Sequence, residues 1–190
     1  AGPSPVAPSP PFPTTLEALQ ERLRRADDLP GTHYGQIRAL PHGVAEAPLM
    51  IISDCPDEDD LASGAILSGA TGTLLRNMLS AIGIDLAACY RASLSVTRPP
   101  SGRLRAEDLP RLADFMRGHI ALAAPKNLLI LGTAASEALV AQPIVQAREN
   151  LHEFNHDGGT NALVATYHPR TLLRRPHCKR PAWDDLQLLL

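Results

Sequence analysis

The stretch "TYHPRTLLRRPHCKRPAW", residues 166–183, carries the densest chemistry in the chain. His168 and Pro169 stand at the exit of an apolar run, and an imidazole can move a proton near neutral pH. No acidic residue lies between positions 169 and 183, while the basic residues there are Arg170, Arg174, Arg175, Lys179 and Arg180. These features are compatible with a catalytic turn, a grip on a nucleic-acid backbone, or only the basic end of a helix.

An acidic stretch forms the second concentration of charge. It reads "SDCPDEDD" and contains Asp54, Asp57, Glu58, Asp59 and Asp60. Carboxylate oxygens in this number can bind a divalent cation. No histidine lies within the stretch, and a solvated acidic loop is the more common outcome, so we predict no metal site here.

Histidine and cysteine offer a further metal-binding alternative. His152, His156, His177 and Cys178 do not follow the spacing of a zinc site, which favours surface residues. Cys55, Cys89 and Cys178 are scattered and form no CxxC pair. We therefore predict three free thiols and no resident cofactor.

Length and composition are typical of one globular α/β domain. The chain has 190 residues, 44% apolar and 20% charged, with a net charge of -2. No apolar run is long enough to cross a bilayer, and no signal peptide is visible, so a cytoplasmic protein is expected. Residues 1–13 hold six prolines and predict a disordered tail before a single domain over residues 14–190. Because the net charge is slightly negative, nucleic-acid binding would have to rest on a local basic surface.

Strand and helix patterns alternate along the domain. Strands are predicted over residues 47–53, 89–96 and 127–132, and two more, joined near Gly158, over 145–156 and 160–168. Helices are predicted over residues 16–26, 71–84, 106–125, 133–141 and 179–190, with Thr15 or Thr14 capping the first. This alternation predicts a mostly parallel sheet covered by helices on both faces. Ligands bind such sheets beyond the carboxyl ends of the strands, where the acidic stretch and the His168 stretch both fall.

Taken together, these two stretches resemble the uracil-DNA glycosylase superfamily, most closely its family 4. "HPRTLLR" is similar to the family's His-Pro-Ala-x-Leu-Leu-Arg, and "KRPAWDDL" to its closing Lys-Arg-x-x-Trp-x-Asp-Leu. "SDCPDEDDLASGAILSG" stands for its Gly-Glu-Ala-Pro-Gly loop, and "VTRPPSGR" for its Cys-Arg-Pro-Pro-Gly-Asn-Arg segment. The match covers residues 48–190 and implies a three-layer α/β/α sandwich with a mostly parallel four-stranded sheet.

The resemblance also implies a set of site residues. His168 stands where the family keeps the histidine that donates a hydrogen bond to the departing uracil anion. Asp54 replaces the family's glutamate, which stabilises the sugar cation or orients a water molecule. Leu67 stands for the phenylalanine that stacks on the base, and Ser93 for the asparagine that reads the uracil edge.

Several of these positions depart from the family pattern. Leu67 has no π-face, and Ser93 offers one short hydroxyl in place of an amide donor and acceptor. Asp57 replaces a loop glycine. Two of the four cysteines that hold the family's iron–sulfur cluster are replaced by Thr97 and Leu112, so no cluster is expected.

Two functions follow from the resemblance. In the first, the protein is a uracil-DNA glycosylase-like protein of DNA repair or replication with reduced or lost base excision, acting through DNA or protein binding. In the second, it is an active, divergent glycosylase that hydrolyses the N-glycosidic bond of uracil or another deaminated base. Both predict DNA contacts from Arg170, Arg174, Arg175 and Lys179. A replication or repair protein is the expected protein partner, and no membrane association is expected.

Overall fold

The computed structural model describes residues 11–190. The strands are β1 (Leu49–Ser53), β2 (Tyr90–Ser93), β3 (Asn127–Leu131), β4 (Leu151–His156) and β5 (Gly159–Thr166). The α-helices are α1 (Leu16–Arg25), α2 (Glu58–Ser63), α3 (Gly69–Ala81), α4 (Leu109–Ala123), α5 (Thr133–Val140), α6 (Ile144–Ala147), α7 (Pro169–Arg174) and α8 (Lys179–Leu186). Short 3-10 helices occupy Thr32–Tyr34, Leu86–Ala88, Ala106–Asp108, Pro176–Cys178 and Gln187–Leu189.

Within the described residues the strands form one five-stranded sheet in the order β2-β1-β3-β5-β4. The first four strands in that order are parallel, and β4 pairs antiparallel with β5. The mostly parallel sheet agrees with the prediction, but the count of four strands that the family resemblance implied is wrong by one. The two-residue turn at Asp157 and Gly158 folds β5 back beside β4, which adds an antiparallel edge strand to a parallel sheet.

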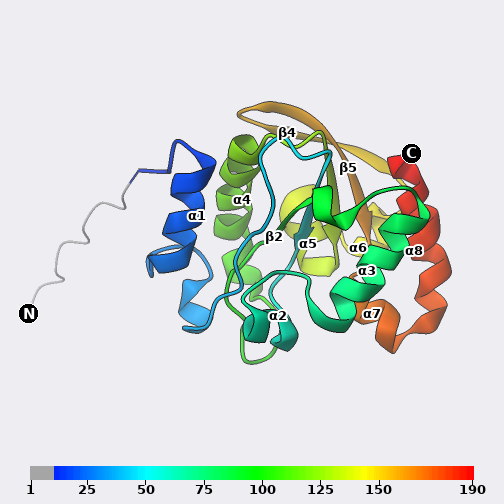
Figure 1. Ribbon diagram of the computed structural model, residues 1–190, viewed down its shortest axis with the longest axis horizontal. Helices are drawn as coiled ribbons and strands as arrows, with labels where there is room; N and C mark the ends of the chain where they lie inside the picture. Colours follow the sequence, from blue (N-terminus) through cyan, green and yellow to red (C-terminus); the bar gives the residue numbers. More distant parts are fainter. Residues whose placement is uncertain (1–10) are drawn as a thin grey trace, which may run out of the picture.

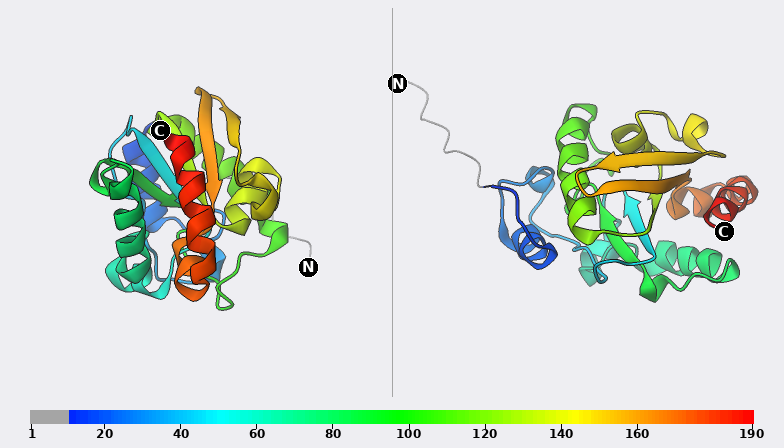
Figure 2. Two further views of the ribbon diagram at one scale, coloured as in Figure 1. Left: turned by 90° about the vertical axis from the view of Figure 1, so that its right-hand side faces the viewer. Right: turned by 90° about the horizontal axis from the view of Figure 1, so that it is seen from above.

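Helices cover both faces of the sheet, which confirms the three-layer α/β/α arrangement (Figure 1). Alternate side chains of β1 point to opposite faces: Met50 and Ile52 pack with α4 and α5, whereas Leu49 and Ile51 pack with α3 and α8. The views of Figure 2 show α3 and α4 on opposite sides of the strands. Burial on both faces explains why β1 reads as a continuous apolar run.

Helix α1 packs outside α4 through Leu19 and Leu23. Thr15 caps this helix as expected, because its hydroxyl oxygen accepts the Ala18 N–H at 3.2 Å. Residues 1–10 of the predicted tail lie outside the described residues. Phe12, which also belongs to that predicted tail, packs edge-on against Phe115 of α4 with ring centroids 5.3 Å apart.

The segment between β1 and α3 is more ordered than the sequence suggested. The acidic stretch was predicted to be a solvated loop, but α2 forms from its Glu58 onward, and Asp60 stabilises the start of the helix by accepting the Asp57 N–H at 3.0 Å. Ser68 precedes α3, which begins two residues before the predicted start of this helix at position 71. No helix in residues 11–190 combines the length and the apolar character that crossing a membrane would require.

Candidate functional site

The carboxyl ends of three neighbouring strands form the floor of a groove of about 980 Å³. Asp54 follows β1, Gly132 follows β3 and His168 comes two residues after the end of β5. A Cβ atom on Gly132 would lie 3.4 Å from the His168 Cβ and 4.0 Å from Asp54 Oδ2. The absence of a side chain at Gly132 therefore keeps the space between the carboxylate and the imidazole open.

His168 is buried and caps the first turn of α7. Its Nδ1 accepts the backbone N–H of Arg170 at 3.1 Å, and its Nε2 lies 3.2 Å from an Arg170 guanidinium nitrogen. Burial, with a further contribution from the Arg170 charge, lowers the pKa of His168 well below 6.5. The imidazole is therefore neutral at pH 7. Both of its nitrogens face an N–H donor, so one neutral ring cannot satisfy both.

Arg170 reaches into the centre of the site. Its guanidinium donates to Asp54 Oδ1 at 3.0 Å and to the Cys55 carbonyl oxygen at 2.9 Å, and its Nε lies 3.1 Å from Asp57 Oδ1. Only 18% of its side chain is exposed. Arg170 was predicted to contact DNA, but here its charge is engaged inside the protein. It stands at the alanine of the family motif His-Pro-Ala-x-Leu-Leu-Arg, a departure in the sequence that signals this role.

Burial raises the pKa values of two groups on the acidic side of the site, Asp57 and Cys55. Burial raises the pKa of Asp57 above its ordinary value, although Arg170 and Arg98 oppose the shift. Arg98 also donates to the Pro56 carbonyl oxygen at 2.7 Å, which ties this loop to the segment after β2. Burial raises the pKa of Cys55 to about 12, so its thiol stays protonated and is a poor nucleophile.

Leu67 and Ser93 do not line the groove. Leu67 is 1% exposed and packs with Leu75 and Leu79 of α3. Ser93 is 4% exposed, and its hydroxyl donates to the Ser95 carbonyl oxygen at 2.6 Å. The structure thus brings His168, Asp54 and Arg170 together but leaves the two predicted base-binding side chains behind the wall of the site.

The predicted DNA-contacting residues fall into three different places. Arg174 and Arg175 are exposed and line the groove, whereas Lys179 is exposed and lies outside its lining. Arg170 points inward, as described above. The structure adds Arg98 and Arg103 to the groove lining. Both belong to "VTRPPSGR", a segment that carries part of the family resemblance but for which no site role was predicted.

Acidic and sulfur-containing side chains do not assemble a metal site in the part of the chain that the structure describes, residues 11–190. Asp60 is buried and accepts the Ser68 N–H at 2.6 Å, so it stabilises the loop before α3. Cys55, Cys89 and Cys178 are free, as predicted, and the structure shows all three to be buried. Thr97 and Leu112 occupy the predicted cluster positions with a hydroxyl and a hydrocarbon group, neither of which ligates iron in such clusters.

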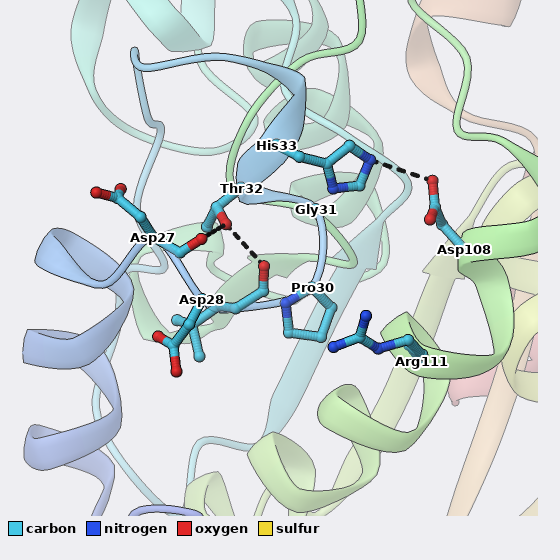
Figure 3. A pocket seen from close by; sticks show the side chains of 9 residues that line it. Asp27, Asp28, Pro30, Gly31, Thr32, His33, Asp108 and Arg111 are labelled. Carbon is cyan, nitrogen blue, oxygen red and sulfur yellow. Dashed lines mark hydrogen bonds and ion pairs between the residues drawn. The ribbon is translucent and has the colours of Figure 1, made fainter. Parts of the chain in front are cut away.

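A second, smaller cavity of about 180 Å³ lies beside those two positions, between the loop after α1 and the start of α4. Figure 3 shows its lining, in which His33 Nε2 lies 3.4 Å from Asp108 Oδ2. The Thr32 hydroxyl lies 2.7 Å from the carbonyl oxygens of Asp27 and Leu29. The three lining carboxylates also pair with arginines outside the lining: Asp28 with Arg22, Asp27 with Arg38 and Asp108 with Arg105. The charged groups around this cavity are thus already engaged by the protein.

Known proteins match this chain along most of its length. A family model described as the uracil DNA glycosylase superfamily matches residues 40–187. The chain is 23% identical over 180 residues to the Type-4 uracil-DNA glycosylase of Pyrobaculum aerophilum, covering 91% of this chain and 92% of that protein. It is 24% identical over 184 residues to the Type-4 uracil-DNA glycosylase of Archaeoglobus fulgidus, covering 90% and 92%. The motifs, the fold and the family match agree, and the chain belongs to the uracil-DNA glycosylase superfamily.

Proposed function

We propose that this chain is a DNA-binding member of the superfamily, acting in DNA repair or replication, whose excision of uracil is strongly reduced or lost. The observation that carries the proposal is the position of Arg170. Its guanidinium bonds to Asp54 and lies against His168, so it fills the room that a base would need to contact both groups. A cytoplasmic location and a repair or replication protein as partner remain part of this proposal.

Displacing Arg170 would carry an energetic cost. The guanidinium lies between two carboxylates that are mostly buried, with side-chain exposures of 17% for Asp54 and 18% for Asp57. Separating partly buried charges without a new partner leaves each of them poorly solvated. While Arg170 is bound, Asp54 is neutralised and is a weak stabiliser of a sugar cation. The same contact directs an N–H donor at His168 Nε2, where a hydrogen bond to uracil would otherwise form.

DNA binding is supported by the exposed arginines of the groove. Arg174 and Arg175 border it on the α7 side, and Arg103 borders it on the other. No carboxylate in the described residues forms an ion pair with these three within 4.0 Å. Unpaired guanidinium groups along a groove are suited to a phosphate backbone, which they contact without reading sequence.

The first experiment measures excision directly. Single- and double-stranded oligonucleotides carrying uracil, hypoxanthine or xanthine are incubated with stoichiometric protein, and abasic sites are cleaved and resolved on a gel. We expect little or no product above that given by His168→Ala. Robust product that disappears in His168→Ala would refute the proposed loss of activity.

The second experiment measures DNA affinity as a function of salt concentration. The double variant Arg174→Ala with Arg175→Ala should bind DNA more weakly. The slope of log Kd against the logarithm of the salt concentration should also fall by about 1 for each phosphate contact removed. Arg24→Ala with Arg25→Ala on α1, far from the groove, is the matched control and should bind as the unmodified chain does. Equal loss in both double variants would contradict a binding site at the groove.

Active excision is the second candidate, because His168 and Asp54 both line the groove. If Arg170 alone blocks the reaction, Arg170→Ala should raise the rate of abasic-site formation, whereas Arg170→Lys should not. If Arg170→Ala remains inactive while it still binds DNA, the blocked and incomplete site of the first proposal is supported.

A further inference from the structure

Three buried hydroxyl groups follow one another at alternate positions from the end of β2. Ser93, Ser95 and Thr97 are 4%, 0% and 0% exposed. Ser93 donates to the Ser95 carbonyl oxygen at 2.6 Å, and Ser95 donates to the Thr97 carbonyl oxygen at 2.8 Å. Thr97 in turn donates to the carbonyl oxygen of Gly31. We call this series of hydrogen bonds the hydroxyl ladder.

The ladder ends on the loop that follows α1. Gly31 has φ +85°, and a Cβ atom there would lie 2.9 Å from the Ser95 Cβ and 3.3 Å from Leu112 Cδ2. Only glycine allows both this backbone conformation and this close approach. The ladder therefore joins two segments that are more than sixty residues apart in sequence, through side chains that are fully buried.

The same place is where the family resemblance puts two ligands of an iron–sulfur cluster. Thr97 and Leu112 occupy those positions, and both converge on Gly31. The chain's three cysteines are Cys55, Cys89 and Cys178, none of them in this region. The residues present do not fit a cluster, which needs four thiolates.

We propose that the hydroxyl ladder replaces the cluster as the fastening between the N-terminal segment and the sheet, and that it commits Ser93 to this structural task. The loss of a base-reading amide at position 93 and the loss of a cluster cysteine at position 97 are then one linked change. A side chain of Ser93 that donates into the ladder does not reach the groove. This inference does not depend on whether the chain excises a base.

The hydroxyl ladder is linked to the groove through Arg98. Arg98 directly follows Thr97, and its guanidinium donates to the Pro56 carbonyl oxygen in the loop that carries Asp54 and Asp57. Fixing the backbone at Thr97 fixes the origin of that side chain. Ser95 and Thr97 are thus positioning residues for one wall of the groove.

The test removes the hydroxyls one at a time. Ser93→Ala, Ser95→Ala and Thr97→Val should each raise the equilibrium constant for unfolding about 5- to 30-fold, because each removes a hydrogen bond to a buried carbonyl oxygen. The effect of Thr97→Val should be the smallest of the three, since the Gly31 carbonyl oxygen still accepts the Tyr34 N–H at 3.2 Å. Thr97→Ser keeps the hydroxyl and should restore most of the loss. Ser101→Ala is the matched control: its exposed hydroxyl donates to the Arg103 carbonyl oxygen in the next turn, and its removal should change little.

Two measurements distinguish the hydroxyl ladder from ordinary side-chain packing: the energetic coupling between its members, and hydrogen exchange in the loop where it ends. Ser95→Ala and Thr97→Val together should cost less than the sum of the two single variants, because the bonds belong to one network. Amide hydrogen exchange in residues 27–34 should accelerate in Thr97→Val and not in Ser101→Ala. Additive losses, or unchanged exchange in that loop, would overturn the proposed fastening.

Two further results would overturn the proposal. Protein purified without oxygen should contain no stoichiometric iron or acid-labile sulfide; a stoichiometric content would show that a cluster is present after all. Ser93→Ala should leave DNA affinity for uracil-containing and normal oligonucleotides equal to each other. A selective loss for uracil, with stability unchanged, would assign Ser93 to base reading. Neither result depends on the gel assay for excision.

Discussion

Two arginine–carboxylate centres lie near the carboxyl end of the sheet, and they differ in how completely they are hydrogen-bonded. Arg148 binds Asp185 through two guanidinium nitrogens at 2.8 and 3.1 Å, and Asp185 also accepts from the Thr166 hydroxyl and the Glu149 N–H. Arg170 lies between Asp54 and Asp57. Within the described residues, neither the Arg170 Nε nor the Asp57 Oδ2 has a hydrogen-bond partner. The first centre is closed and the second lines the groove.

The difference separates a structural ion pair from one that is available for function. Asp185 is 0% exposed and joins α8 to the end of β5, while Arg148 lies over the Tyr167 ring at 4.6 Å. Both carboxylate oxygens of Asp185 accept hydrogen bonds from protein donors, so a rearrangement of this centre would only lose hydrogen bonds. At Arg170 two buried polar atoms lack hydrogen-bond partners, so this centre has less to lose on rearrangement than the first. Unsatisfied polar groups beside a groove are therefore the better indicator of the functional site.

The largest expected effect on stability comes from breaking the ion pair between Arg148 and Asp185. Asp185→Asn removes the buried counter-ion of Arg148 and leaves it only the exposed Glu149 carboxylate, 3.3 Å away. It should lower the free energy of unfolding by about 3–5 kcal/mol. Urea denaturation measures this loss. Asp184→Asn, at the exposed neighbouring position, is the control and should change stability by less than about 0.5 kcal/mol. A small effect of Asp185→Asn would remove the contrast between the two centres.

An acid-dependent loss of stability is expected next. Burial lowers the pKa of His119 to about 4 and that of His168 well below 6.5. Below pH 6.5 the unfolded chain takes up protons that these folded histidines do not, so stability falls as the pH drops toward 4. From pH 7.5 to pH 5 the loss is about 2 kcal/mol for His119 alone.

The pH dependence of stability should change when Arg170, which lies between Asp54 and Asp57, is removed. Its charge adds to the lowering of the His168 pKa, so Arg170→Ala should make the acid-dependent loss smaller. Denaturation curves at several pH values measure the difference, with His177→Ala, an exposed histidine, as the control. An unchanged profile in Arg170→Ala would indicate that the guanidinium does not sit against the imidazole in solution.

The smallest effect is expected at Asp57. Burial raises the pKa of this carboxyl, so its ionised form carries a cost at neutral pH that asparagine would not. Asp57→Asn should leave stability unchanged or raise it by up to about 1 kcal/mol at pH 7, and the gain should disappear as the pH falls through the carboxyl pKa. Thermal unfolding at pH 7 and pH 4 tests this. A loss as large as that of Asp185→Asn would make the two centres equivalent.

Much of the architecture follows from the order of residues. Buried parallel strands must be apolar throughout, so "LMIIS" and "NLLIL" mark β1 and β3. Pro110 in the first turn of α4 and Thr15 at the start of α1 mark helix ends, because caps act through neighbours in sequence. The carboxyl ends of the strands then place Asp54 and His168 together. These features depend on local periodicity, which the sequence states directly.

Other features required distant residues to meet. The sequence shows Arg170 only as one of several basic residues, and its inward direction depends on Asp54 and Asp57, more than one hundred positions earlier. Ser93 reads as a short polar substitute until the structure places it in the hydroxyl ladder that ends on Gly31. The sequence by itself determined the superfamily, the layers and the pair Asp54 and His168. Only the tertiary structure decided which arginine fills the site and where the hydroxyls point, because side-chain direction and ion pairing depend on partners that folding alone brings within bonding distance.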